Sequence, residues 1–281
     1  MKIGVYLPTI LPGVGARDIH TWARRAEELG FTTLAVTDRG ADEPFEPLAT
    51  VATALALTER IAVLGDMSHS PGWSAELHAR HTASMDRAGR GRYVDGITFP
   101  DPLSVVDGLD PADSFWLTDA QLAELHRADR TTGVASHAGP SSLVIGGHAD
   151  AVADLVARHG DGWLLRAGTP DGFRQGLARI HAAWTTAGRV GRPAATVAFH
   201  FALGDWAVSA SEFLHHRMRI AHGAETADAV IAGSAADEPG VRARITAFAA
   251  AGADEVLAVP STPDITQLER LAAALPQLTH A

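Results

Sequence analysis

The stretch S-L-V-I-G-G-H-A-D-A-V-A-D-L-V-A-R-H-G-D-G-W (Ser142–Trp163) contains a strand, a helix and the start of a second strand. Leu143–Ile145 is a short apolar run that predicts a buried strand, and Trp163–Leu165 predicts the next one. Between them, Gly146-Gly147 opens a helix and Gly160 ends it. The buried face of this helix is expected to hold Val152, Leu155 and Val156. The stretch therefore predicts the alternation of strand and helix that decides the fold.

The same alternation continues in both directions along the chain. Short apolar runs predict eight strands, at Lys2–Leu7, Phe31–Thr37, Ile61–Leu64, Tyr93–Thr98, Leu143–Ile145, Trp163–Leu165, Thr196–Leu203 and Glu255–Val259. Helical patterns separate them. We expect four of these helices to begin at the N-caps Asp18, Ser74, Asp171 and Thr262.

Eight strands, each followed by an amphipathic helix, in 281 residues predict one (β/α)₈ barrel domain over residues 1–281. A doubly wound open sheet is the alternative. The barrel is favoured because no break in composition divides the chain. No G-x-G-x-x-G follows a strand either, since Gly13 and Gly15 lack their third glycine.

One long irregular segment interrupts this pattern. Phe99–Ser141 is rich in Pro, Gly, Asp and Ser, which predicts a surface excursion between the fourth and fifth strands. Within it, Thr118 and Gln121 form a capping box that predicts a helix from Asp119 to about Asp129.

Composition excludes several classes of protein. The chain has no cysteine, which excludes disulfides, thiolate-bound zinc, iron–sulfur clusters and a cysteine nucleophile. Its single lysine, Lys2, leaves none for a phosphate loop or a mid-chain Schiff base. A net charge of −10 without a basic run argues against nucleic acid as a partner. Because no apolar stretch is long enough to span a membrane and Met1–Pro8 is too short for a signal peptide, we expect a cytoplasmic protein without a membrane partner.

Functional residues of a (β/α)₈ barrel collect at the carboxyl ends of its strands. The polar residues expected there include Asp38, Arg39, Asp66, Ser68, His69, Thr98, His148, Arg166 and His200. Each one taken singly is explained equally well as a helix cap or a rim residue, but their concurrence favours a site.

The Gly146-Gly147 pair is the most specific local signal. Two residues without a Cβ at a helix N-terminus let a ligand reach the backbone amides, which predicts an anion site, although a tight turn explains the pair equally well. Two histidine pairs, His78 with His81 and His215 with His216, have no carboxylate at metal-ligand spacing. We therefore expect solvated histidines and no metal site.

Four segments, in this order and spacing, resemble those of a known family. They are A-E-E-L-G-F-T-T-L-A-V-T-D-R (Ala26–Arg39), T-E-R-I-A-V-L-G-D (Thr58–Asp66), Ser142–Trp163 as quoted above, and V-R-A-R-I-T-A-F-A-A-A-G-A-D-E-V-L-A-V (Val241–Val259). Together they are similar to the bacterial luciferase-like family of flavin- and deazaflavin-dependent oxidoreductases over nearly the whole chain.

This resemblance implies a (β/α)₈ barrel, often dimeric, with FMN or the 8-hydroxy-5-deazaflavin coenzyme lying across the carboxyl ends of the strands. Gly146 and Gly147, followed by His148, match the glycine turn whose amides hold the cofactor phosphate. The third-strand turn, where family members often have a non-proline cis peptide beside the isoalloxazine, corresponds to Asp66, Met67 and Ser68 together with Gly65.

The chain also departs from the family. Asp38 matches the acidic residue after the second strand, but Arg39 follows it where family members commonly have a histidine. The glycine-rich turn after the fourth strand is replaced by D-G-I-T-F-P-D-P (Asp95–Pro102), and the excursion before the fifth strand is shortened. A guanidinium stays protonated, so Arg39 cannot act as a base and is expected to bind an anion instead.

The leading hypothesis is an oxidoreductase, either a luciferase-like monooxygenase or a deazaflavin-dependent dehydrogenase, that acts as a homodimer on a small organic substrate. His69 and His200 are the expected proton donors, and Asp38 and Asp66 are expected to orient them or to contact the cofactor ring. Arg39 and Thr98 are expected to bind the substrate. The alternative, suggested by Arg39 and the altered fourth turn, is a cofactor-free barrel that acts as a non-redox enzyme or a small-ligand binding protein.

Overall fold

The computed structural model describes residues 1–37, 45–67, 74–99, 120, 122–123 and 142–275. Its strands are β1 (Lys2–Tyr6), β2 (Thr33–Thr37), β3 (Ala62–Met67), β4 (Tyr93–Thr98), β5 (Leu143–Gly146), β6 (Gly162–Leu165), β7 (Ala194–Phe201) and β8 (Glu255–Pro260). They form one closed parallel barrel in chain order, and β8 pairs with β1 through Lys2 opposite Glu255 and Val5 opposite Ala258. The barrel prediction is confirmed and the open sheet is wrong.

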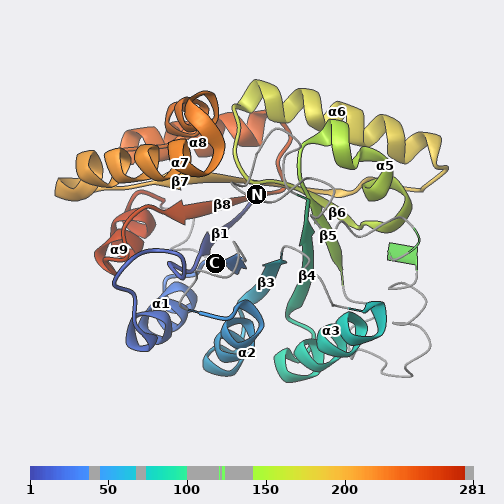
Figure 1. The fold of residues 1–281 in the computed structure, drawn as a ribbon, viewed down its shortest axis with the longest axis horizontal. Coiled ribbons are helices and arrows are strands. Elements are labelled where there is room, and N and C mark those ends of the chain that lie inside the picture. The colour runs from blue at the N-terminus through green and yellow to red at the C-terminus, as the bar shows by residue number, and fades with distance from the viewer. Residues whose placement is uncertain (38–44, 68–73, 100–119, 121, 124–141, 276–281) are drawn as a thin grey trace.

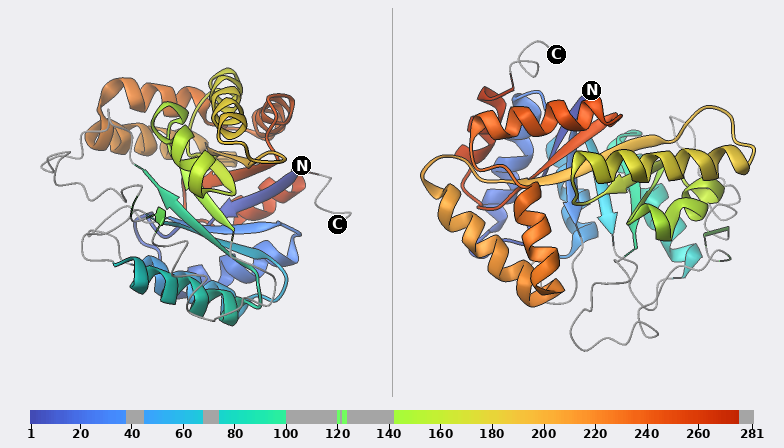
Figure 2. Two further views of the ribbon diagram at one scale, coloured as in Figure 1. Left: turned by 90° about the vertical axis from the view of Figure 1, so that its right-hand side faces the viewer. Right: turned by 90° about the horizontal axis from the view of Figure 1, so that it is seen from above.

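Helices surround this barrel on the outside (Figures 1 and 2). They are α1 (Ala16–Glu28), α2 (Pro47–Leu57), α3 (Ala75–Gly89), α5 (Ala149–His159), α6 (Pro170–Thr186), α7 (Ala207–Gly233), α8 (Glu238–Ala250) and α9 (Thr266–Ala273), with a short 3₁₀ turn, η1 (Gly204–Trp206), before α7. Helix α7 consists of two helical parts that meet at Gly223, whose φ of 83° is not helical. No helix in the described part of the chain is long and apolar enough to cross a membrane.

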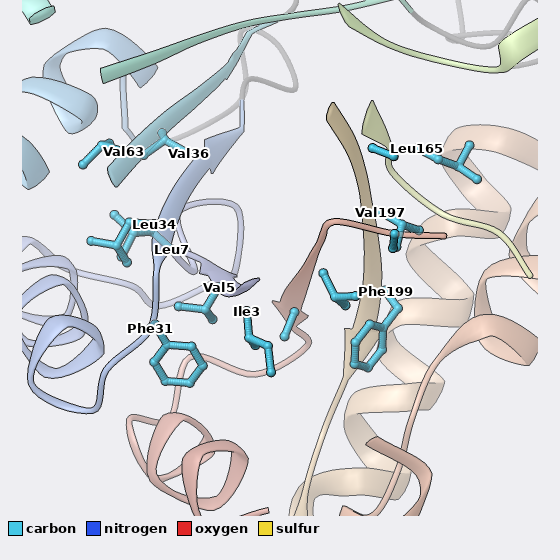
Figure 3. Packing of buried hydrophobic residues seen from close by; sticks show 14 of the residues in the cluster. Ile3, Val5, Leu7, Phe31, Leu34, Val36, Val63, Leu165, Val197 and Phe199 are labelled. Carbon is cyan, nitrogen blue, oxygen red and sulfur yellow. The ribbon is translucent and has the colours of Figure 1, made fainter. Parts of the chain in front are cut away.

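Alternate residues of each strand face opposite sides of the barrel wall. Ile3 and Val5 of β1, and Leu7 directly after it, point outward and pack with Leu34 and Phe31 in the layer between strands and helices (Figure 3). The opposite set fills the barrel interior and comprises Tyr6, Ala35, Leu64, Leu164, Ala198, Leu257 and Val259. The two apolar layers fix the register of the strands, because a shift of one residue would exchange them.

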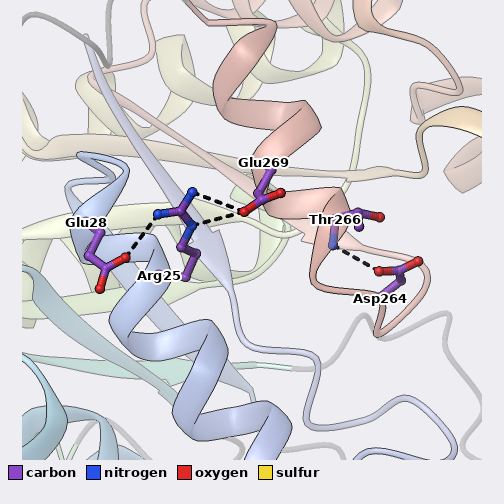
Figure 4. Close-up of polar contacts among 5 residues, drawn as sticks. All are labelled: Arg25, Glu28, Asp264, Thr266 and Glu269. Atoms are coloured by element: carbon purple, nitrogen blue, oxygen red, sulfur yellow. Dashed lines mark hydrogen bonds and ion pairs between the residues drawn. The ribbon is translucent and has the colours of Figure 1, made fainter.

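The first and last helices hold the barrel closed from outside. The Arg25 guanidinium of α1 lies between Glu28 and Glu269, which belongs to α9, at 3.0 Å from each carboxylate (Figure 4). The fully buried Trp22 donates from Nε1 to the carbonyl of Pro263 at 3.0 Å. Residues more than 200 positions apart in the sequence are therefore packed together where the barrel closes.

Several helices begin a few residues away from the predicted N-cap. Ser74 caps α3 as predicted, accepting from Leu77 N at 3.1 Å. Helix α1 begins before Asp18, whose carboxylate instead reaches back to the Gly15 amide at 2.8 Å. Thr169, not Asp171, caps α6, because a Thr-Pro pair supplies both the cap and the first helical residue. The last helix begins at Thr266, so the start predicted at Thr262 is also wrong.

The end of β3 and the excursion before β5 also differ from, or lie beyond, what can be compared with the sequence predictions. Strand β3 runs three residues further than predicted, so Asp66 and Met67 belong to the strand itself. The Thr118–Gln121 capping box and most of the helix expected after it lie outside the described residues, as does nearly all of the excursion before β5.

Candidate functional site

The carboxyl end of the barrel interior is polar, whereas the layers beneath it are apolar. Tyr6, Thr37, Asp66, Arg166 and His200 line one small cavity there, together with the apolar side chains of Ala198 and Val259. Each of the five polar residues comes from a different strand or from the position that directly follows a strand. Closure of the barrel therefore assembles the cluster from five separate parts of the chain.

Asp66 is the centre of this cluster. Its Oδ2 accepts hydrogen bonds from Tyr6 Oη at 2.8 Å and from Arg166 Nε at 2.7 Å, and Thr98 Oγ1 donates to Oδ1. Arg166 also donates from Nη2 to the carbonyl of Asp66 at 3.2 Å. Asp66 has no exposed surface, whereas the Arg166 side chain is 26% exposed. The aspartate thus holds the guanidinium at the barrel mouth.

The contacts of Asp66 also determine its protonation state. Burial would raise the pKa of its carboxyl, but the charge of Arg166 and the hydrogen bonds from Arg166, Thr98 and Tyr6 outweigh burial and lower the pKa below its ordinary value. Asp66 is therefore ionised at neutral pH and paired with Arg166.

The cavity above this pair is small and contains an unsatisfied hydroxyl. Its volume is about 10 Å³, enough for about one water molecule. Thr37 is 4% exposed, and its Oγ1 has no hydrogen-bond partner among the described residues. Thr9, after β1, has the same property at 1% exposure. Buried hydroxyls normally have partners, so the Thr37 hydroxyl, which lines the cavity, indicates a place where a polar ligand is expected.

The Gly146-Gly147 turn differs from the cradle expected of it. A Cβ at Gly146 would overlap Thr98 Oγ1, so the absence of a side chain is required by the packing of β4 on β5. The Gly147 amide donates to the carbonyl of Leu164 at 3.0 Å within the sheet and is not turned toward a ligand. Its φ of 140° and the nearby Val152 side chain also require glycine. The glycines are therefore explained by structure alone.

Helix α5 still offers backbone donors next to this turn. His148 is its N-cap, and its imidazole makes no capping hydrogen bond. Asp150 in the first turn is ion-paired with Arg179, which offsets the negative charge that would repel an anion. The N-terminus of α5 therefore places backbone donors and the positive end of a helix dipole next to this turn.

The other predicted site residues have different positions. His200 and Thr98 lie at the mouth with Asp66. Met67 points the other way, into the layer between barrel and helices, so only its backbone can face the mouth. No peptide bond of the described residues is cis. Asp38, Arg39, Ser68 and His69, with the bond between Met67 and Ser68, lie outside the described residues.

Sequence reasoning missed the partners of Asp66. It placed Arg166 at a strand end without assigning it a role, and it treated Tyr6 and Thr37 only as strand residues. A signal existed for Tyr6, because a tyrosine on the interior face of a strand needs a hydrogen-bond partner. The pairing of Arg166 with Asp66, 100 residues apart, has no local signal.

A second buried polar cluster lies outside the barrel, between β4 and α3. His78 Nε2 lies 2.7 Å from Asp95 Oδ2, and Thr82 and Tyr93 donate to the same carboxylate at 3.1 Å each. His78 is 4% exposed, so the prediction that it is solvated is wrong. The prediction was wrong because it was based on spacing within the helix alone, whereas the partner, Asp95, comes from β4.

The second pair, His215 and His216, is largely solvated, as expected. His215 lies 2.8 Å from Asp228 with a side chain that is 40% exposed, and His216 is exposed. Within the described ranges, no three His, Asp or Glu side chains are placed to hold a metal ion.

A polar mouth on a closed parallel barrel is the arrangement of a (β/α)₈ enzyme. The chain belongs to the luciferase-like monooxygenase family, whose sequence model matches residues 1–275. The resemblance noted in the sequence is thereby confirmed. No curated protein matches the sequence closely enough to be counted as a relative.

Solved structures that are similar in fold to this chain include those of several oxidoreductases. An F420-dependent secondary alcohol dehydrogenase in complex with an F420–acetone adduct has a TM-score of 0.75 at 15% identity, covering 99% of this chain and 98% of that one. The coenzyme F420-dependent tetrahydromethanopterin reductase of Methanopyrus kandleri gives 0.73 at 14%, with 99% of each chain covered.

A flavin enzyme is similar to a comparable degree. The oxygenating constituent of 3,6-diketocamphane monooxygenase from Pseudomonas putida, in complex with FMN, has a TM-score of 0.68 at 16% identity, covering 97% of this chain and 96% of that one. At such identities the likeness shows the fold, and the cofactor of this chain has to be argued from its own residues.

Proposed function

We propose that this chain is an oxidoreductase that uses reduced FMN or a reduced 8-hydroxy-5-deazaflavin coenzyme, bound at the barrel mouth, to act on a small organic substrate. The observation that carries the proposal is the unpartnered Thr37 hydroxyl beside the Asp66-held Arg166. A flavin or deazaflavin ring has a polar edge of carbonyl and N–H groups, which a hydroxyl and a guanidinium are suited to bind.

The described residues fit such a group at the strand ends and not inside the barrel. A cavity of about 10 Å³ cannot hold a ring system, so Thr37 and Arg166 would contact only the polar edge. The cofactor phosphate would bind at the N-terminus of α5, through the amides of Ala149 and Asp150 and not through Gly147. When bound, the cofactor supplies the two-electron redox chemistry.

The roles of the protein side chains follow from their contacts. Arg166 is fixed by Asp66. It would place its positive charge beside the carbonyl oxygens at the polar edge of the bound ring, where it would stabilise negative charge that develops during the reaction. His200 lines the same cavity and carries the imidazole that moves a proton near neutral pH. Asp66 acts through Arg166 and does not exchange protons itself, because it stays ionised. Asp38 and His69 remain predicted partners from the loops after β2 and β3.

The second candidate function is a barrel without a cofactor that binds a small ligand or acts as a non-redox enzyme. The observation that favours it is the Gly147 amide, which is used within the sheet and leaves the glycine turn without its expected ligand role. A titration of the purified protein with candidate cofactors, described next, distinguishes the two candidate functions. The homodimer and the cytoplasmic location also remain predictions, which sedimentation and cell fractionation can check.

The test is a binding titration of the purified protein with FMN, with riboflavin and with the deazaflavin coenzyme, compared with the variant Thr37→Val. Valine has nearly the shape of threonine and removes only a hydroxyl that has no described partner. We expect one of the two phosphate-bearing cofactors to bind about two- to tenfold more weakly to Thr37→Val, the loss of about 0.5–1.4 kcal/mol that one neutral hydrogen bond supplies. Riboflavin, which has no phosphate, should bind more weakly than FMN if FMN is the cofactor.

The matched control is Thr33→Val on the same strand, because Thr33 lies at the opposite end of the barrel and donates to Glu255 at 2.6 Å. This variant should lose some stability and bind cofactor normally. Absence of binding by all three compounds would favour the cofactor-free alternative. Binding that is unaffected by Thr37→Val would show that the mouth is not where the ring binds.

A further inference from the structure

Helix α7 is an insertion between β7 and the outer ring of helices. In a (β/α)₈ barrel one ring helix follows each strand. Here α8 takes the ring position after β7, because it contacts α6 on one side and α9 on the other, and α9 contacts α1. The main contacts of α7 are with β7 and η1 instead. Helix α7 is therefore additional to the ring and begins at the carboxyl end of the barrel, where the mouth lies.

The two parts of α7 form a unit with a small core of its own. Residues 207–222 and 224–233 meet at Gly223 (Figure 2). His215 from the first part lies 2.8 Å from Asp228 in the second. Four buried apolar side chains from both parts form a separate cluster, namely Leu214, Met218, Ala227 and Val230. We call this unit the α7 hairpin; because a packed core resists deformation, a displacement at one end is transmitted to the other.

The return end of the hairpin contacts the segments that carry Arg166 and His200. Directly after the hairpin, the Ala235 amide donates to the His200 carbonyl at 2.9 Å. Gly233 packs against the backbone of Gly168, whose carbonyl oxygen would lie only 3.3 Å from a Cβ at position 233. Gly168 follows Arg166 by two residues. A displacement of the return end would therefore shift two of the segments that line the mouth.

The first part of the hairpin is held on a different part of the rim by Arg217. Its Nη1 donates to the carbonyl of Ile10 at 2.7 Å, across 207 residues of sequence. Ile10 belongs to the loop after β1, whereas the return end contacts segments at the ends of β6 and β7. A hydrogen bond from a guanidinium is charge-assisted and stronger than a neutral one. Arg217 thus fixes how the hairpin lies on the rim.

We propose that Arg217 is a positioning residue: by holding the α7 hairpin on the loop after β1, it sets the positions of His200 and Arg166 at the barrel mouth. Its effect passes through the core of the hairpin and the return end. The proposal rests on the proposed function only in treating His200 and Arg166 as working groups of the site. The contact that holds the hairpin involves no cofactor.

The experiment compares Arg217→Met and Arg217→Lys with the matched control Arg219→Met in the full-length, cofactor-free protein. Methionine keeps the apolar stem and cannot donate, whereas lysine can still donate to the Ile10 carbonyl. Arg219 is exposed on the same helix. NMR follows hydrogen exchange of the Ala235 amide and the ring resonance of His200, which the variant His200→Gln assigns. Circular dichroism checks that each variant folds.

Arg217→Met should speed exchange of the Ala235 amide at least about tenfold and displace the His200 ring resonance, because the return end is no longer held in place. Amides of α2, outside the hairpin, should keep their exchange rates. Arg217→Lys should restore most of both signals, and Arg219→Met should change neither. A loss of overall stability in Arg217→Met with both signals unchanged would show a merely structural role and overturn the proposal.

Gly233→Val is a second test that leaves Arg217 in place. The new side chain would press on the Gly168 carbonyl and push the return end away, so it should displace the same His200 resonance. If Arg217→Met does not fold, this variant decides, and an unchanged His200 resonance overturns the proposal. Failure of the cofactor titration contradicts only the proposed function, because none of these measurements contains a cofactor.

Discussion

Asp66 is a full negative charge inside the barrel, and it is tolerated there because three side chains satisfy it. Tyr6 and Thr98 are neutral donors, and Arg166 supplies the opposite charge at 2.7 Å. A buried carboxylate without such partners would become protonated or destabilise the fold. The same contacts fix the orientation of Arg166, so stability and function depend on the same residues at the mouth.

The variant Asp66→Asn tests this dependence. It leaves Arg166 without its partner and should lower the free energy of unfolding by about 3 kcal/mol at neutral pH, measured by urea denaturation. Because the folded-state pKa of Asp66 is lowered, its contribution is present above the unfolded pKa of about 3.8 and is lost as the pH falls through the folded value. The difference between variant and native protein should therefore shrink in acid.

The control for this variant is Asp171→Asn, which removes an exposed carboxylate that is 2.7 Å from Arg174. An exposed pair of this kind contributes about 0–1 kcal/mol. Equal losses in the two variants would contradict the role given to Asp66.

At the scale of elements, a buried ion pair joins α3 to β4. Burial would lower the pKa of His78, but the nearby Asp95 carboxylate outweighs burial and raises it. Burial would likewise raise the pKa of Asp95, and His78, Thr82 and Tyr93 together lower it. Both shifts favour the charged forms, so the pair links helix and strand most strongly when His78 is protonated.

This pair predicts a pH dependence of stability. A histidine with a raised folded-state pKa stabilises the protein fully below its unfolded pKa of about 6.5, and that contribution is lost as the pH rises through the folded value. The stability difference between native protein and His78→Gln should therefore decrease from about pH 6.5 upward. NMR titration of the His78 ring should give a midpoint above 6.5. A midpoint below 6.5, or a difference that grows with pH, would contradict the pairing.

Most elements were predictable because each carries its own periodic signal. The eight strands follow from short apolar runs, and Ser74 caps α3 as its sequence indicates. Contacts between distant residues have no such signal. The Arg166–Asp66 pair depends on barrel closure, and the fate of the Gly147 amide depends on the register of β5 with β6. The polar mouth could therefore be located from the sequence, while its hydrogen bonds could not.

For the whole molecule, closure of the barrel depends on apolar packing between the two ends of the chain. Trp22 is fully buried and reaches Pro263, 241 residues later, whereas the Arg25–Glu269 pair beside it is exposed (Figure 4). Exposed ion pairs contribute little because water solvates both partners. The packed indole is therefore expected to hold the first and last helices together.

Trp22→Ala should lower the free energy of unfolding by about 3–5 kcal/mol, because it leaves a cavity where α1 meets the barrel. Arg25→Gln should barely change it. Urea denaturation of both variants, followed by circular dichroism, compares them directly. The account of closure is wrong if Arg25→Gln is the more damaging change.

Cofactor binding at the barrel mouth is tested by a crystal structure of the protein soaked with whichever of FMN and the deazaflavin coenzyme binds in the titration. We predict that the polar edge of the ring contacts Thr37 Oγ1 and the Arg166 guanidinium and that the phosphate binds the first turn of α5. A ring bound elsewhere, or a mouth still closed over Asp66 with no cofactor density at saturating concentration, would contradict the claim.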